Sequence, residues 1–429
     1  MGETSVVTCF LRNRSDVLLR RSEDVGSYPG QWSGVAGHVA IEDGRDRSPE
    51  AVAHAEICEE TGIGPEQVTL VRAGDPFVVT KERLGTRWRV HPFLFDSDTC
   101  AVEGNLETAE YEWVSPTAIL ERDTVPALWT SYDRVRPRVA TVREDRDHGS
   151  AWLSVRALEV LRDEGTIAAV GRDAHEAEQR EVSNGDDWDT LAGLARELLT
   201  ARPLMSVVTN RINRAMATAS EARTVAAIER VTHEGIDRAI TADSEAATTA
   251  AEHLPARVGT LSRSGTVRQA IEECDPSAVL VAESRPGREG VGMAEQLAAT
   301  SDVTLTTDAA FPAELDAWDA DALVVGADRV LPDGRVVNKV GTRGVALASE
   351  TPCYVVTASD KIATDDAVDR EARDPSEVYD GDDDLSVSNP TFDVTPADAI
   401  EAIVTERGIL TDDRLAAVVT EHRTLAEWE

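Results

Sequence analysis

The C-terminal half of the chain is organised around the stretch Val258-Gly259-Thr260-Leu261-Ser262-Arg263-Ser264-Gly265-Thr266. Its first residues predict a buried strand, and the serine- and glycine-rich turn that follows leads into a helical segment. Four further strands are predicted after it, with helical segments between them, at residues 278–283, 303–307, 322–326 and 353–357. Because strands and helices alternate, we expect a doubly wound parallel sheet of the Rossmann-like type over residues 253–429.

Polar residues stand where these predicted strands end: Ser262, Glu283, Thr307 with Asp308, and Asp328. In a doubly wound sheet the carboxyl ends of the strands converge on the ligand crevice. The loop at residues 262–266 offers hydroxyls, a guanidinium and the free backbone N–H groups of a helix start, which together suit a phosphate. Arg285 is a second phosphate candidate. Any one of these residues alone is better explained by turn or capping chemistry, whereas four strand ends together favour a site.

Two other patterns precede this domain. Residues 150–252 are helical, with an amphipathic helix at 152–162, a polar stretch at 165–187 that we interpret as a linker or long loop, and helical periodicity from 188 to 250. Residues 1–145 alternate short β-rich runs with turns, including a hairpin at 6–11 and 17–19 and strands at 68–72, 77–80 and 88–95. We therefore expect domains at residues 1–145, 150–252 and 253–429.

One helix of the first domain carries three neighbouring carboxylates. It is predicted over residues 49–61, with Ser48 as its N-cap and Gly62 at its end. Spacings of three and four residues place Glu56, Glu59 and Glu60 on one face. Such carboxylates repel one another unless a hard cation screens them, and Mg²⁺ accepts oxygen ligands of this kind. The alternative is an ordinary acidic helix face in an acidic chain.

This helix and its surroundings resemble the Nudix family. Glu56, Ile57, Glu59, Glu60, Gly62 and Ile63 match the second half of the Nudix box, and residues 32–39 and 112–114 are also similar to that family. The resemblance implies an α/β/α sandwich that cleaves a nucleoside diphosphate compound with Mg²⁺ or Mn²⁺. Glu56, Glu59 and Glu60 would hold the metal, and Glu59 and Glu60 would be catalytic. The family arginine is Ala55 here, and the earlier acidic position falls at Asp43 or Arg47.

The remainder of the chain, from about residue 150, resembles the family of the initiation factor 2B alpha, beta and delta subunits. This family includes methylthioribose-1-phosphate and ribose-1,5-bisphosphate isomerases. The matching motifs follow in order: Arg202-Pro203-Leu204-Met205, the 260–266 loop, Glu283-Ser284-Arg285-Pro286, Gly326-Ala327-Asp328-Arg329, Asn338-Lys339-Val340-Gly341-Thr342 and Asn389-Pro390-Thr391-Phe392-Asp393.

The second resemblance implies a sugar-phosphate site and a homo-oligomer formed through the C-terminal domain. The isomerases of the family move protons with an aspartate and a cysteine, and these positions are Asp328 and Ser262 here. A serine hydroxyl is a far poorer acid or base than a thiol, so isomerisation by the standard route is in doubt. The implied substrate-binding residues are Arg202, Arg263, Ser264, Gly265, Thr266, Arg285, Asn338 and Lys339.

The composition limits the kinds of partner that we expect the protein to bind. The net charge is -36, from 79 acidic and 43 basic residues, spread through foldable sequence, which indicates adaptation to high salt. No basic stripe suggests nucleic-acid binding, and no apolar run suggests a membrane span or a secretory leader, so we expect a cytoplasmic protein. Among only three lysines, Lys339 stands in a motif, whereas Lys81 and Lys361 are interpreted as chance survivors.

Three functional hypotheses follow. The leading one is a metal-dependent Nudix hydrolase of a nucleoside diphosphate compound fused to a sugar-phosphate-binding, isomerase-like module. A non-catalytic alternative is a regulatory protein of the initiation factor 2B type with a ligand-sensing Nudix domain. In a third, only the Nudix module catalyses, and the remainder assembles and regulates.

Overall fold

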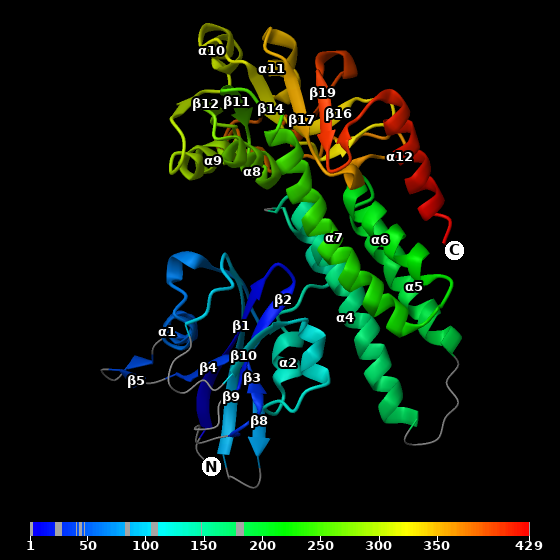
Figure 1. Cartoon of the computed structure of the whole chain (residues 1–429). Coiled ribbons are helices and arrows are strands. Elements are labelled where there is room, and N and C mark those ends of the chain that lie inside the picture. The colour runs from blue at the N-terminus through cyan, green and yellow to red at the C-terminus, as the bar shows by residue number, and fades with distance from the viewer. Residues whose placement is uncertain are drawn as a thin grey trace. The chain divides into compact units, whose positions relative to one another are not determined.

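A computed structural model describes residues 3–21, 28–39, 41–42, 45–46, 48–81, 86–103, 110–146, 148–176 and 184–428 (Figure 1). The chain forms two compact units. The first comprises Met1–Arg138 with Thr166–Glu181, and the second comprises Val139–Gly165 with Val182–Glu429. Each unit has its own sheet and its own apolar core. Within the described residues, no helix combines the length and the apolar character that crossing a bilayer requires.

The first unit is built on a mixed sheet with strand order β10-β2-β1-β9-β7, to which β3, β4 and β8 add at β2, β1 and β9. The predicted hairpin and the three later strands are confirmed, and β1 lies parallel to β9. The strands are β1 (Glu3–Asn13), β2 (Asp16–Arg21), β3 (Trp32–Ser33), β4 (Val35–His38), β7 (Val68–Ala73), β8 (Phe77–Lys81), β9 (Thr86–Ser97) and β10 (Glu110–Val114); β5 (Ile41–Glu42) and β6 (Arg45–Asp46) pair separately.

A helix covers each face of this sheet. On one face α1 (Pro49–Thr61) buries Val52 and Ile57 against Phe95, and on the other α2 (Leu128–Asp133) buries Tyr132 against Phe10. The ends of α1 are those predicted: the Ser48 hydroxyl accepts the N–H of Ala51 at 3.2 Å, and Gly62 takes a left-handed φ of 72°. The unit is therefore the expected α/β/α sandwich.

A helical region precedes the second sheet in the sequence. Its helices are α3 (Val139–Glu144), α4 (Ser150–Glu176), α5 (Asn184–Ala201), α6 (Ser206–Ala219) and α7 (Val225–Ala251). The linker expected at residues 165–187 is wrong in part, because α4 continues to Glu176 and α5 already begins at Asn184. One glycine costs a helix only about 1 kcal/mol, and the alanine- and charge-rich sequence after Gly165 has good helix propensity. Residues 177–183 of the expected linker lie outside the described residues.

The doubly wound sheet has the order β13-β12-β11-β14-β17-β19-β20. All neighbours are parallel except β19 and β20, and the order reverses between β11 and β14. The five predicted strands are confirmed, and β19 is a sixth parallel strand that the sequence analysis missed. The strands are β11 (Arg257–Leu261), β12 (Ala278–Ala282), β13 (Val303–Thr306), β14 (Ala322–Val325), β17 (Cys353–Val356), β19 (Ala402–Thr405) and β20 (Gly408–Ile409).

Helices cover both faces of this sheet (Figure 1). One core contains apolar residues of α7, α8 (Gly265–Cys274) and α9 (Glu289–Leu297), and the other contains residues of α10 (Phe311–Ala317), α11 (Thr342–Ala348) and α12 (Asp412–Leu425). A small antiparallel sheet, β15 (Arg329–Val330), β16 (Val336–Lys339) and β18 (Phe392–Thr395), follows the end of β14.

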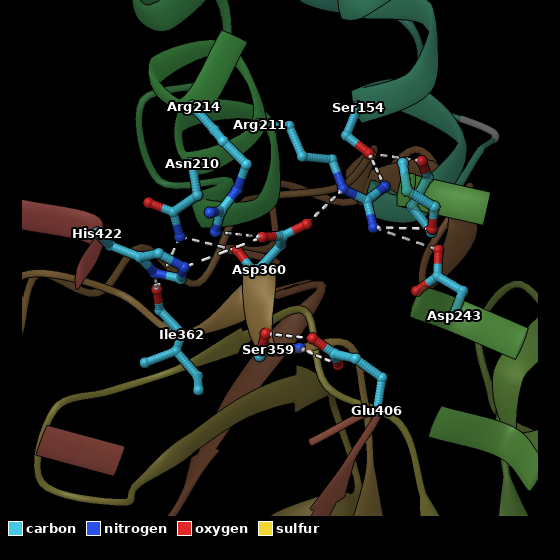
Figure 2. A network of polar contacts seen from close by, with 12 residues as sticks. Ser154, Asn210, Arg211, Arg214, Asp243, Ser359, Asp360, Ile362, Glu406 and His422 are labelled. Carbon is cyan, nitrogen blue, oxygen red and sulfur yellow. Dashed lines mark hydrogen bonds and ion pairs between the residues drawn. The ribbon is translucent and has the colours of Figure 1, made fainter. Parts of the chain in front are cut away.

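Buried charges join the helical part to this sheet within the second unit. Figure 2 shows Asp360, in the turn after β17, between Arg211 and Arg214 of α6, with ion pairs of 3.1 and 3.3 Å. The Asn210 amide also donates to the backbone oxygens of Asp360 and Ile362, at 2.8 Å each. Because a buried ion pair is costly to break, this network fixes α6 against the sheet and with it the loop before α6.

Candidate functional site

The strands on either side of the reversal carry Ser262 and Asp328 just beyond their carboxyl ends. Ser262 follows β11, with a left-handed φ of 63°, and Asp328 follows β14. The two loops approach closely, since a Cβ added at Gly326 would lie 3.0 Å from the hydroxyl oxygen of Ser264. Crevices at such a reversal are where open α/β sheets bind ligands. Asp328 is therefore at the expected edge of the sheet.

Hydrogen bonds fix the loops after three neighbouring strands. The N–H of Ser262 donates to the hydroxyl of Ser284 at 2.6 Å. The N–H groups of Ser284 and Arg285 donate to the two carboxylate oxygens of Asp308, at 2.8 and 2.6 Å. Asp308 is thus used to hold the strand ends together, which positions the backbone of Ser262.

A cavity of about 290 Å³ lies beside Asp328. Its wall includes Arg202 and Arg329, the carboxylates Asp369 and Glu371, and Arg143 and Arg146 from the segment around α3. Two of the predicted site residues, Asp328 and Arg202, line this cavity. Both come from motifs separated by more than one hundred residues in sequence, so the fold brings them together.

Asp328 is a partly buried carboxyl group with a hydrogen-bond donor on one side and a nearby ammonium group. The hydroxyl of Ser150, at the start of α4, donates to its Oδ1 at 3.1 Å. Burial raises the pKa of Asp328 above its ordinary value, although the ammonium of Lys361 acts in the opposite direction. A raised pKa favours the protonated form of this carboxyl group, which is the direction that a proton donor requires.

The interpretation of Lys361 as a chance survivor is wrong. Its ammonium is buried and donates to the backbone oxygen of Ala327 at 2.7 Å, beside Asp328. Lys339 is also buried, pairs with Glu289 at 2.6 Å and contributes to lowering the pKa of Asp328. Two of the three lysines in the chain therefore face this aspartate, where a compact point charge fits better than a planar guanidinium.

The other predicted binding residues have structural partners. Asn338 donates to the hydroxyl of Thr342 at 3.0 Å, and Ser264 caps α8 by accepting the N–H of Val267 at 3.3 Å. Gly265 and Thr266 form the first turn of that helix. Arg263 is exposed, and Arg285 is exposed and pairs with Glu283 at 3.3 Å. None of these residues lines the cavity.

The sequence analysis missed several groups at the cavity. Glu371 pairs with Arg202 at 3.4 Å and lines the wall, but it lies in a loop rather than at a strand end. Ser150 opens a helix and gave no signal beyond that of a capping residue. The sequence analysis used strand ends and family motifs, so polar residues outside both, such as Glu371 and Ser150, escaped it.

In the first unit, the carboxylates of α1 have separate surroundings. Glu60 is buried and pairs with Arg20 of β2 at 2.9 Å. Glu56 lies directly against the backbone of Gly37 in β4, and Glu59 is exposed. Within the described residues, no three His, Cys, Asp or Glu side chains are gathered to hold a metal ion. The oxygen donors suit Mg²⁺, but in this arrangement Glu60 forms an ion pair with Arg20. Asp43 and Arg47 lie outside the described residues.

Comparisons with known proteins agree with this division. The model of the NUDIX domain matches residues 2–135, and that of the initiation factor 2 subunit family matches residues 146–412. The chain is 38% identical over 168 residues to the ribose 1,5-bisphosphate isomerase of Haloferax volcanii, covering 36% of this chain and 51% of that protein. It is 32% identical over 252 residues to the methylthioribose-1-phosphate isomerase of Chloroflexus aurantiacus, covering 51% and 72%. The chain spans about half the length of several such curated relatives.

Solved structures share the fold of the second module. A translation initiation factor eIF-2B of Pyrococcus horikoshii matches with a TM-score of 0.52 at 24% identity, covering 63% of this chain and 94% of that one. The 5-methylthioribose 1-phosphate isomerase of the same organism matches with a TM-score of 0.51 at 19% identity, covering 73% and 89%. The chain therefore belongs to the initiation factor 2 subunit family and carries a Nudix domain ahead of that module.

Proposed function

We propose that the second module binds a ribose phosphate in the cavity beside Asp328. The observation that carries this proposal is that Arg202 and Asp328, from two family motifs, line one cavity, and that Asp328 lies just beyond the carboxyl end of β14. Arg202 is buried and already donates to Val142, Asp145 and Glu371, so its contribution to phosphate binding is the positive charge that it places at the cavity wall. The names of the isomerase relatives point to the same class of ligand.

Isomerisation by this module is proposed to be slow. Converting an aldose into a ketose moves a proton between adjacent carbons, and Asp328 has the raised pKa that one partner of such a transfer needs. Ser262 occupies the second position, and a hydroxyl exchanges protons poorly. Binding depends on the charged residues and does not need a thiol.

The binding proposal is tested by calorimetric titration of the full chain with ribose 5-phosphate and ribose 1,5-bisphosphate. We expect micromolar to millimolar affinity, weakened about tenfold or more by Arg202→Gln and by Lys339→Ala, because each removes a positive charge from the surroundings of Asp328 and its cavity. Arg230→Gln, an exposed residue of α7 paired with Glu234, is the matched control. Absence of binding, or equal binding by all four proteins, would exclude the proposed site.

For the first module we propose metal-dependent hydrolysis of a nucleoside diphosphate compound. The NUDIX match and the three carboxylates of α1 support it. A bound Mg²⁺ or Mn²⁺ would polarise a phosphoryl oxygen and activate water. Glu56, Glu59 and Glu60 are the proposed ligands, and metal binding by Glu60 requires that its carboxylate leave Arg20.

Hydrolysis is tested by screening nucleoside diphosphate compounds with Mg²⁺ and identifying the products by mass. We expect the double variant Glu59→Gln, Glu60→Gln to lose about two orders of magnitude in rate, as when a metal's charge stabilisation is lost. If the double variant hydrolyses as fast as the parent, the helix holds no catalytic metal. Inertness of the parent, together with a stable protein partner, would support the regulatory alternative.

We further propose that the two modules act on related compounds in a salt-adapted, cytoplasmic homo-oligomer. Hydrolysis of a nucleoside diphosphate compound can release a ribose phosphate, which the second module would bind or convert. Oligomerisation is supported by the solved tetrameric eIF2B complex, which shares the fold of this module. Light scattering after size-exclusion chromatography in molar KCl tests the assembly, and a monomer would contradict it.

A further inference from the structure

The segment between the two family matches contributes to the cavity. The NUDIX match ends at residue 135, and the initiation factor match begins at residue 146. Arg143, in α3, lies between these limits, and Arg146 is the first residue of the second match. Both line the cavity beside Asp328. Part of the cavity wall therefore comes from Arg143, which lies outside the match to the initiation factor 2 subunit family, and from Arg146, the first residue of that match.

The backbone of this segment is held by the cavity's own arginine. The Nε of Arg202 donates to the backbone oxygen of Val142 at 3.0 Å, and its NH2 group donates to the oxygen of Asp145. The side chain of Val142 is fully buried. The packing of α3 and the hydrogen bonds from Arg202 thus fix the backbone that carries Arg143 and Arg146 at the cavity.

The arginines that line the cavity outnumber the carboxylates that line it. Four arginines line it against three carboxylates, although the whole chain is strongly acidic. Arg202 is engaged by α3 and Glu371, and Arg329 pairs with Asp365 at 2.6 Å.

The two outer arginines are exposed at the cavity. One terminal nitrogen of Arg146 donates to the backbone oxygens of Arg143 and Asp145, at 2.9 Å each, and its Nε is 3.8 Å from Glu371. The Arg146 side chain is nevertheless 58% exposed. Arg143 is exposed, and within the described residues its guanidinium has no recorded hydrogen bond or ion pair. Burial lowers the pKa of Arg202, and the charge of Arg146 lowers it further, which shows that the cations repel one another. An anion between them would relieve this repulsion.

We propose that Arg143 and Arg146 bind a phosphate group of the sugar-phosphate ligand and so determine the affinity of this cavity for phosphorylated sugars. The inference rests on the proposed function of the second module and assigns part of its site to the segment that joins it to the Nudix sequence. Arginines present a planar fork to phosphate, and such contacts are stronger than neutral hydrogen bonds.

The test is calorimetric titration of the full chain with ribose 5-phosphate at two salt concentrations. Arg143→Gln combined with Arg146→Gln should weaken binding at least about tenfold and reduce its salt dependence. Arg143→Lys with Arg146→Lys should restore part of the affinity, which a purely structural role would not predict. Arg230→Gln is the control, and unfolding temperatures should stay close to that of the parent because both side chains are exposed.

The outcomes separate the two proposals. If the parent binds and Arg202→Gln weakens binding, but the double glutamine variant binds like the parent, the role of Arg143 and Arg146 is refuted while the proposed function stands. If the parent binds no ribose phosphate, both proposals fail. Loss of affinity in the glutamine variant with partial recovery in the lysine variant supports the inference.

Discussion

Both modules carry charged motif residues, but these residues have different partners. In the second module, Arg202 and Asp328 face a cavity, and Lys339 and Lys361 lie near the same aspartate. In the first, Glu60 is neutralised inside the domain by Arg20. The difference shows that a sequence motif identifies the fold. Whether the motif residues can bind a ligand depends on which of them already form ion pairs within the domain.

The largest expected effect separates binding from chemistry in the second module. Ser262→Cys should raise the rate of aldose-to-ketose conversion of ribose 1,5-bisphosphate by roughly 10²–10⁴-fold, the usual contribution of a positioned acid–base group. Ligand affinity should change little. Ser262→Ala gives no increase, and adding Asp328→Asn to the cysteine variant should abolish the gain. Rapid isomerisation by the parent would instead show that a hydroxyl suffices.

The next prediction concerns the partner that occupies Glu60. Arg20→Met removes the arginine partner of the buried Glu60 carboxylate, so the free energy of unfolding of the first unit should fall by about 3–5 kcal/mol. MnCl₂ should raise the unfolding temperature of this variant more than that of the parent, because a metal ion can replace the lost charge. Both are measured by calorimetry.

Arg87→Met provides the matched control for this variant. Arg87 pairs with Glu3 at 3.7 Å on the same sheet, but both side chains are largely exposed, so less than about 1 kcal/mol should be lost. If manganese stabilises both variants equally, the metal acts elsewhere than at Glu60.

High salt should affect both modules, because the excess of acid is spread along the whole chain. With a net charge of -36, raising KCl from 0.1 M to several molar should screen self-repulsion and raise the unfolding temperature by on the order of 10 °C. Thermal scans followed by circular dichroism measure this. A flat profile would indicate that the acidity serves another purpose.

The smallest effect is on the acid stability of the second module. A hydrogen bond from Arg407 lowers the pKa of Glu421 to about 2. The stabilisation from its ionised form is therefore present above about pH 4.5 and is lost as the pH falls towards 2. The side chain is a third exposed, so Glu421→Gln should cost only about 1 kcal/mol at neutral pH and nothing near pH 2. Urea denaturation across this range measures it, with Glu245→Gln of α7 as control; a pH-independent difference would contradict it.

Much of the fold was predictable from local pattern. The ends of α1 followed from Ser48 and Gly62, and five parallel strands followed from apolar runs before polar residues. The extension of α4 was missed because Gly165 and the polar sequence after it resemble a linker, although one glycine costs a helix only about 1 kcal/mol. Strand β19 was missed because a short apolar run gives no period that separates it from a helix.

The site residues that could be predicted are those that follow a strand or stand in a family motif. Asp328 follows β14 and could be found in this way, whereas Glu371 and Lys361 reach the same region from a loop and a short turn. The pairing of Arg20 with Glu60 joins two elements about forty residues apart in sequence. Such contacts depend on tertiary packing, and no spacing rule within one sequence reports them.

Hydrogen–deuterium exchange of the full chain, with and without ribose 1,5-bisphosphate, tests the central claim most directly. We predict that the ligand slows exchange in the peptides that contain Arg143 and Arg146, Arg202, Asp328 and Glu371, and leaves the peptides of α1 unchanged. Protection confined to α1 and the strands around it, with no change at the cavity beside Asp328, would contradict the account.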